Sequence, residues 1–314
     1  MALPLACTAP KTLPPTAAAN SSNCNHQKEY NYRAADMPVP YHTLQIDTLL
    51  TRRFSTQALQ AAHAIGLLGT LKAFVALQQQ QAAHPASQQY IQLLQYMQRI
   101  QQRIQVASLE IAAVAGEMDC EEERADQIAV YLNNLQDNTA NRLTVGAIVA
   151  GAAGAVTAGL LLLSGNTSNA PELIGIGTGL VETVLGALLL RPQKTVQFLH
   201  PRNALSDIWN GPATSSIFPA PVWYYLNYEN DTDKPLSPRR QLIAKWQNFG
   251  QIADVKEKKK QQVYNLFFGK GGAYTADQLT NRANMYDQIE AQINLMKQDL
   301  KLLAAELEQL YTPF

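Results

Sequence analysis

Apolar residues recur at alternating spacings of three and four residues between positions 90 and 135. They are Tyr90, Leu93, Met97, Ile100, Ile104, Ala107, Ile111, Val114 and Met118 and, after an interruption at Glu121, Ala125, Ile128, Leu132 and Leu135. A seven-residue repeat of this length predicts a helix packed on a partner helix in a left-handed supercoil. Because no proline lies between Ala86 and Leu163, we expect this helix to continue into the hydrophobic segment that follows.

A second array with the same spacing lies near the C-terminal end. Its apolar positions are Tyr286, Ile289, Ile293, Met296, Leu300, Leu303, Leu307 and Leu310. Thr275 and Gln278 fit a capping box at the start of this predicted helix. We expect the two arrays to pair as antiparallel helices, although association between chains would satisfy the same pattern.

The remaining segments differ in pattern and composition. A helical spacing of apolar residues covers Thr43–Ala83 and ends at His84-Pro85, and a further helix is expected at about Pro238–Phe268. We therefore divide the chain into five parts: a disordered tether (1–40), helices with the long heptad stalk (41–142), a hydrophobic hairpin (143–191), an irregular segment rich in proline and aromatic residues (192–235), and a helical hairpin with the C-terminal coiled coil (236–314). The predicted fold is mainly α, an elongated antiparallel coiled coil or helical bundle.

The segment Leu143–Leu163 has the composition of a membrane helix. It contains no charged residue, and as a helix it would be about 31 Å long, which matches the hydrocarbon thickness of a bilayer. A polar turn at 164–170 separates it from a second apolar segment, Leu173–Leu190. Small residues at three- and four-residue spacing would let two membrane helices approach closely. The predicted packing glycines are Gly146, Gly151, Gly154, Gly159, Gly175, Gly179 and Gly186.

Some charged residues near the hairpin favour membrane insertion, and one opposes it. Arg142 precedes the hairpin, and Arg191 and Lys194 follow it. Both ends of the hairpin would therefore lie on the side of the membrane where basic residues accumulate, with the uncharged turn on the other side. Glu182 lies within the second segment, and a carboxylate in a membrane normally faces a bundle interior or an aqueous lumen. The alternative is a helix pair buried in a large soluble bundle.

The overall composition excludes few functions but favours a helical scaffold. Charged residues make up 16% of the chain, compared with about 25% in typical soluble domains, and the net charge is zero. This balance gives no field that would attract nucleic acid. The basic run Lys256–Lys260 is interpreted as a solvated helix face.

Three cysteines leave two questions open. Cys7 follows Leu5-Ala6, which resembles the end of a lipoprotein signal, so Cys7 is a candidate for lipidation; the alternative is an ordinary cysteine in the tether. Cys24 and Cys120 could pair in an oxidising compartment.

Candidate catalytic chemistry is absent from the sequence patterns. Gly269–Gly272 lacks the ending of a phosphate-binding loop, the histidines have no zinc-ligand spacing, and no serine or cysteine stands in a nucleophile motif. We expect a non-enzymatic protein without cofactor or metal. Four aromatic residues after the hairpin are candidates for a membrane-interface belt, with packing on the stalk as the alternative: Trp209, Trp223, Tyr224 and Tyr225.

Two resemblances concern architecture alone. The glycine-rich hairpin resembles those of some bacterial envelope proteins, and a hydrophobic hairpin between long amphipathic helices is similar in plan to α-helical pore-forming toxins of the cytolysin A type. From the hairpin and the heptad arrays we expect a structural or assembly component of a bacterial envelope that inserts the hairpin in a lipid bilayer and oligomerises through coiled coils, with itself or with other coiled-coil subunits. The alternatives are a secreted pore-forming protein and a soluble helical interaction module. No functional residue is carried over from either resemblance.

The hairpin hypothesis predicts the behaviour of the Gly154→Leu variant. The larger side chain should impair close packing of the two membrane helices and leave the helicity of the stalk unchanged. Circular dichroism and oligomer analysis in liposomes would measure these two effects. If the variant packed as the original chain does, the glycine-packing interpretation would be wrong.

Overall fold

The computed structural model describes residues 22–26, 32, 34, 37–39, 44–83, 86–163, 194–229, 236–252 and 257–311. Among residues 139–163, it describes the side chains of Asn141, Thr144, Val145 and Val149. The described chain is mainly helical with two short strands, which confirms the predicted mainly α class.

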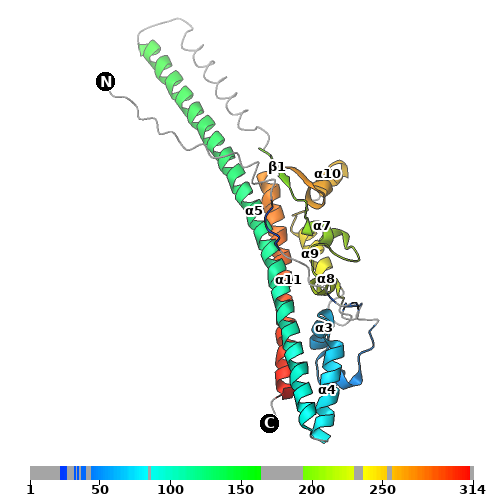
Figure 1. Cartoon of the computed structure of the whole chain (residues 1–314). Coiled ribbons are helices and arrows are strands. Elements are labelled where there is room, and N and C mark those ends of the chain that lie inside the picture. The colour runs from blue at the N-terminus through cyan, green and yellow to red at the C-terminus, as the bar shows by residue number, and fades with distance from the viewer. Residues whose placement is uncertain are drawn as a thin grey trace, which may run out of the picture.

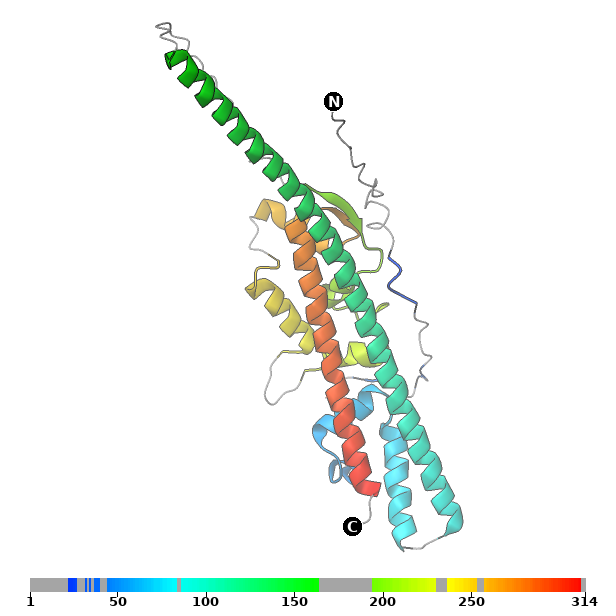
Figure 2. The same ribbon diagram turned by 90° about the vertical axis from the view of Figure 1, so that its left-hand side faces the viewer.

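Two long helices form the axis of the molecule. α5 (Ser87–Leu163) and α11 (Ala276–Tyr311) lie side by side and run in opposite directions (Figures 1 and 2). The predicted capping box begins α11: the Thr275 amide donates to the Gln278 side chain over 3.0 Å, and the Gln278 amide donates to the Thr275 hydroxyl over 3.3 Å. These bonds satisfy two amides that have no partner within the helix.

The apolar positions of both helices meet in one buried seam. The buried seam residues of α5 are Leu93, Ile100, Ala107, Ile111, Val114, Met118, Ala125, Ile128 and Leu132, and those of α11 are Tyr286, Ile289, Ile293, Met296, Leu300, Leu303 and Leu307. Tyr90, at the start of the predicted α5 array, is exposed. The seam joins parts of the chain that are far apart in sequence, so it fixes the shape of the whole body.

Three short helices pack at the lower end of the body. α2 (Thr48–Thr51), α3 (Thr56–Ala64) and α4 (Leu68–Ala83) replace the single helix expected over Thr43–Ala83, so that prediction was wrong. The Ser55 hydroxyl accepts the Ala58 amide and caps α3, and Gly66 adopts a φ of +70°, which a glycine tolerates without strain. α4 precedes α5 in the chain and packs beside the beginning of α5 (Figure 2).

The segments between the arm and α11 form a layer on one side of the two long helices (Figure 1). In chain order they are β1 (Val196–Leu199), α7 (Ala204–Asn210), α8 (Ala220–Asn227), α9 (Pro238–Asn248), α10 (Glu257–Phe268) and β2 (Gly271–Tyr274). β1 and β2 pair antiparallel, with Val196 opposite Tyr274 and Leu199 opposite Gly271. The sequence predicted an irregular segment where β1, α7 and α8 lie, and one helix where α9 and α10 lie; a turn at Gly250 (φ +70°) follows α9.

The seam makes a sharp prediction about two neighbouring positions of α11. Ile293 is fully buried in the seam, whereas Leu295 is 42% exposed. Ile293→Ala should lower the free energy of unfolding by about 2–5 kcal/mol through lost burial and a residual cavity. Leu295→Ala should change it by less than about 0.5 kcal/mol. Urea unfolding followed by circular dichroism would compare them, and equal losses would contradict this account of the seam.

Candidate functional site: a projecting arm and the polar cluster at its base

α5 continues well beyond the point where α11 begins, and its last part projects from the body (Figures 1 and 2). We call residues 136–163 the arm; the rise from Leu135 to Leu163 is about 42 Å. The Lys194 ammonium donates to the carbonyl oxygen of Leu135 over 2.8 Å. The chain therefore leaves the body at Leu135 and returns to the same place 59 residues later.

The described part of the arm carries exposed apolar side chains. Val145 and Val149 are 59% and 61% exposed. In the part of the chain that the structure describes, no helix has the length and apolarity needed to span a membrane.

Most of the predicted hairpin lies outside the described side chains. Gly146, Gly151, Gly154 and Gly159 are positions of α5, but nothing beyond their helical backbone is described. Outside the described residues altogether lie Gly175, Gly179, Gly186, Glu182 and Cys7.

Below the arm, α5 carries four charged residues at seven-residue intervals, Arg103, Glu110, Glu117 and Arg124. This spacing places them in one row beside the apolar seam. Each is bonded to a different part of the chain: Arg103 to the Ile65 carbonyl, Glu110 to Tyr32, Glu117 to Arg202, and Arg124 to the Leu199 carbonyl. The charged row therefore attaches the N-terminal, α3–α4 and β1–α7 segments to the long helix.

The two upper positions of the row hold the chain around β1. Glu117 accepts from both Nε and Nη2 of Arg202, over 2.9 and 3.4 Å. Arg124 donates to Glu121 over 2.7 Å and to the Leu199 carbonyl over 3.4 Å, and its guanidinium lies 4.0 Å from the centre of the Phe198 ring. Burial raises the pKa of Glu117 in spite of the opposing effect of Arg202.

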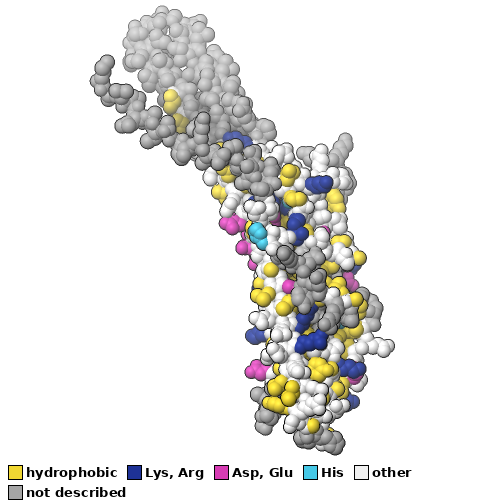
Figure 3. Space-filling model, in the orientation of Figure 1, with side chains coloured by type: hydrophobic (Ala, Val, Ile, Leu, Met, Phe, Trp, Pro, Cys, Tyr) yellow, Lys and Arg dark blue, Asp and Glu magenta, His cyan; other side chains and the backbone are white. Residues whose placement is uncertain are grey.

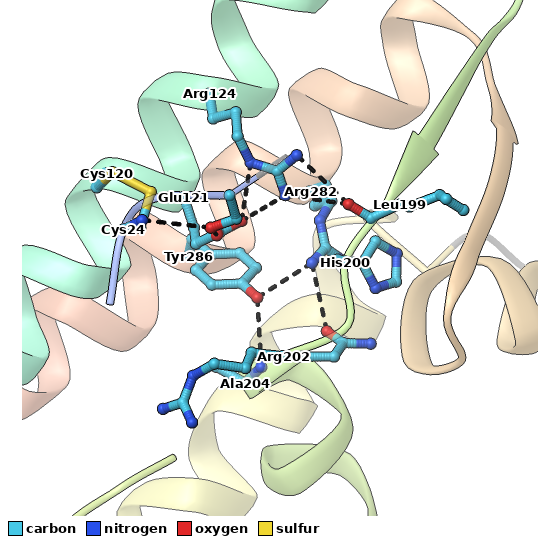
Figure 4. Close-up of polar contacts among 12 residues, drawn as sticks. Cys24, Cys120, Glu121, Arg124, Leu199, His200, Arg202, Ala204, Arg282 and Tyr286 are labelled. Atoms are coloured by element: carbon cyan, nitrogen blue, oxygen red, sulfur yellow. Dashed lines mark hydrogen bonds and ion pairs between the residues drawn. A yellow bond between two sulfur atoms is a disulfide. The ribbon is translucent and has the colours of Figure 1, made fainter. Parts of the chain in front are cut away.

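Arg282, a residue of α11, is a fully buried arginine close to these contacts (Figure 4). Arg282 donates to Tyr286 over 3.0 Å and to Asn203 over 3.3 Å, and its guanidinium lies 4.9 Å from the centre of the Tyr286 ring. In the described chain, no carboxylate lies within 4 Å of Arg282. Burial raises the pKa of Tyr286 to about 12, so its hydroxyl stays protonated and donates or accepts as a neutral group.

His200 is the titratable group most strongly affected by this environment. Burial, and then the nearby positive charge of Arg282, lower the pKa of His200 to about 2. Its Nε2 atom lies 3.0 Å from the Tyr274 hydroxyl and 3.2 Å from the Leu266 carbonyl oxygen. The imidazole is therefore neutral and serves to join β1 to β2 and α10.

The N-terminal part is held on the same face of α5. We call the described residues between 22 and 39 the strap. A disulfide joins Cys24 to Cys120, and the Ser22 hydroxyl donates to Glu121 (Figure 4). Farther along, the Tyr32 hydroxyl donates to Glu110. Closing a loop across 96 positions would stabilise the fold by about 4–5 kcal/mol in the chain-entropy account.

Three carboxylates near this cluster could hold a cation. The acidic oxygens of Asp119, Glu122 and Glu290 all lie within 4.8 Å of one another. Burial and neighbouring negative charges raise the pKa values of Glu122 and Glu290. The residues between them in sequence are otherwise engaged, because Cys120 is in the disulfide and Glu121 pairs with Arg124.

The four candidate interface aromatics pack inward. Trp223 is buried and stacks on Phe218 at 5.5 Å, and Trp209 stacks on Phe268 at 4.6 Å. Tyr224 and Tyr225 are half-buried against the core. Trp209 and Trp223 thus pack within the layer beside the two long helices, and the membrane-interface role of the four residues stays a prediction.

Sequence reasoning did not find the buried arginine cluster. His200 and Asn203 lie in the segment between β1 and α7, whereas Arg282 lies on α11, so their meeting depends on how this segment packs on α11. The seven-residue spacing of charges along α5 was a visible signal that this side of the helix binds other segments.

Comparisons with known protein families, with curated proteins and with solved structures found no match to this chain. On the face shown in Figure 3, hydrophobic, basic and acidic side chains of the described body are intermingled.

The lowered pKa of His200 predicts a pH-dependent stability. The unfolded chain binds a proton at His200 as pH falls below about 6.5, whereas the folded chain does not. Stability should therefore be lost as pH falls, by about 1.4 kcal/mol per pH unit below that value for this group.

The test compares the original chain with His200→Gln by urea unfolding at pH 7.5 and pH 5.5. The difference between their free energies of unfolding should shrink at the lower pH. His26→Gln, at an exposed position of the strap, is the control for removing a histidine. A difference that stayed constant with pH would show that His200 titrates alike in both states.

Proposed function

We propose that this chain is a non-enzymatic, membrane-associated component of a bacterial cell envelope, anchored by the hairpin at 143–191. The observation that supports the proposal is the course of α5. Its apolar end leaves the body as a continuation of the same helix, about 42 Å long, instead of folding back on the described body (Figure 2). A long apolar helix directed away from a folded body is suited to insertion in a bilayer.

The heptad arrays predict oligomerisation through coiled coils, but their seam is filled within one chain, so the assembly role rests on the glycine-rich hairpin and the rest of the helical body. In this proposal α5 and α11 wind as an antiparallel coiled coil and carry the body away from the membrane. Homo-oligomers would form through the glycine faces of neighbouring hairpins, or other coiled-coil subunits would bind the body. The seam itself is already occupied within one chain, because its apolar residues are buried between α5 and α11.

The disulfide supports a body outside the cytosol, opposite to the cytoplasmic side that the positive-inside rule predicts from the basic residues flanking the hairpin. Disulfides persist in oxidising compartments such as the bacterial periplasm and are rare in cytosolic proteins. Cys24 and Cys120 are paired, which leaves Cys7 as the remaining cysteine. Lipidation at Cys7 would add a second membrane attachment and belongs to the same proposal.

The second candidate is a pore-forming protein, and Glu182 favours it. A carboxylate within the second hydrophobic segment would face a lumen if several hairpins assembled around a channel. An anchored chain should stay in the membrane pellet after a carbonate wash. A pore-forming chain should be soluble first, then oligomerise and release dye from liposomes. Monodisperse behaviour without liposome binding would contradict both and leave the soluble interaction module.

Two exposed valine and leucine positions on α5 allow a matched test of the arm. Val149 on the arm and Leu109 on the body are 61% and 63% exposed. A lysine costs about 2.5–3.5 kcal/mol at the centre of a membrane helix and less nearer the interface. Val149→Lys should therefore reduce partitioning into vesicles about tenfold, whereas Leu109→Lys should leave it unchanged. Equal partitioning of the two variants would rule out insertion of the arm.

A further inference from the structure

The disulfide lies in a continuous line of contacts that leads to the base of the arm. Cys24 is bonded to Cys120, and two residues before Cys24 the Ser22 hydroxyl donates to Glu121. Figure 4 shows the disulfide close to Glu121 and Arg124 on α5. The strap thus reaches the carboxylate that orients Arg124.

Arg124 also contacts β1, so it connects Glu121 with that strand. Its guanidinium donates twice to Glu121, over 3.2 Å from Nε and 2.7 Å from Nη2, and its Nη1 and Nη2 atoms each lie 3.4 Å from the Leu199 carbonyl oxygen. The same guanidinium covers the Phe198 ring at 4.0 Å. Two residues before β1, Lys194 donates to Leu135 and closes the base of the arm.

Glu121 needs both of its partners because it is buried. Its side chain is 6% exposed and accepts from Arg124 on one oxygen and from Ser22 on the other. A buried carboxylate that loses a hydrogen bond bears the cost of its desolvation, and its neighbours rearrange to let water in. Arg124 would then hold Leu199 and Phe198 less firmly.

We propose that the Cys24–Cys120 disulfide is a redox latch for the base of the arm. In the oxidised chain the latch fixes Ser22 on Glu121, and through Arg124 it fixes β1 and the point where the arm returns to the body. In the reduced chain the part of the strap at 22–26 separates from α5, while Tyr32 stays bonded to Glu110, and the base of the arm loosens. The latch therefore regulates the element to which the proposed function assigns membrane insertion.

The latch closes by thiol–disulfide exchange, and the oxidant is the disulfide of another exported protein. One thiolate of the pair attacks a sulfur of the oxidant and forms a mixed disulfide, and the second thiolate displaces the oxidant from it. Two electrons and two protons pass to the oxidant, which leaves as a dithiol, and the Cys24–Cys120 bond remains. Both cysteine residues are half-buried. A protein dithiol that carries out the same exchange in reverse is the reductant that opens the latch, and it leaves as a disulfide.

Hydrogen exchange of the full chain in solution tests the latch without any membrane. Oxidised chain is compared with chain reduced by dithiothreitol and with the double variant Cys24→Ser, Cys120→Ser. Peptides covering 22–26, 194–203 and 56–83 report on the strap, the base of the arm and the α3–α4 region. Reduction should speed exchange in the first two peptides, by about tenfold at the base, as expected for losing one hydrogen bond to a charged group. The α3–α4 peptide should not change.

The Ser22→Ala variant distinguishes a latch that acts through Glu121 from a disulfide that only holds the strap on α5. This variant keeps the disulfide and removes the bond to Glu121, so exchange should rise in 194–203 while the strap stays attached. Cys7→Ser is the matched control for loss of a cysteine and should behave as the original chain. If reduction changed only the 22–26 peptide, or if Ser22→Ala left 194–203 unchanged, the latch would be ruled out. That result would leave membrane insertion of the arm intact, because the valine and leucine variants test it separately.

Discussion

The apolar seam between α5 and α11 is the contact on which every other part of the body depends. It is made of large aliphatic and aromatic side chains that are removed from water along most of the length of α11, and this burial supplies most of the driving force for folding. With the two helices fixed, the short elements of the N-terminal and central segments need only to pack on one side of them. The seam also sets the direction of the arm, since the arm is the same helix beyond the end of its partner.

Beside the seam, the charged row of α5 determines which segment lies where. Arg103 binds the end of α3, Glu110 binds the strap, and Glu117 and Arg124 bind the chain around β1; the partners are carbonyl oxygens, a tyrosine hydroxyl and Arg202. Apolar packing tolerates small shifts along a helix, whereas hydrogen bonds to charged groups have narrow geometry. The row therefore specifies register for segments whose own hydrophobic patterns are weak, such as the strap and the chain around β1.

The described contacts that hold the body together all lie on one side of Leu135. The seam, the charged row and the disulfide all lie below Leu135, and the described helix above that residue presents Val145 and Val149 to its surroundings. Exposed apolar side chains on a projecting helix are unfavourable in water and favourable in a bilayer. The proposed anchor and the proposed latch meet at the base of this arm, where β1 and Lys194 join α5.

The sequence by itself determined the helical class, the two heptad arrays, the capping box of α11 and the hydrophobic character of the arm. These are local or periodic properties, and a period of seven or a run of apolar residues can be recognised without knowing what it packs against. Only the tertiary structure decided that Cys24 reaches Cys120, that His200 and Arg282 lie together, and that the region before α4 breaks into short helices. Those features depend on contacts between residues up to about a hundred positions apart or on single residues such as Gly66, and no periodicity in the chain encodes them.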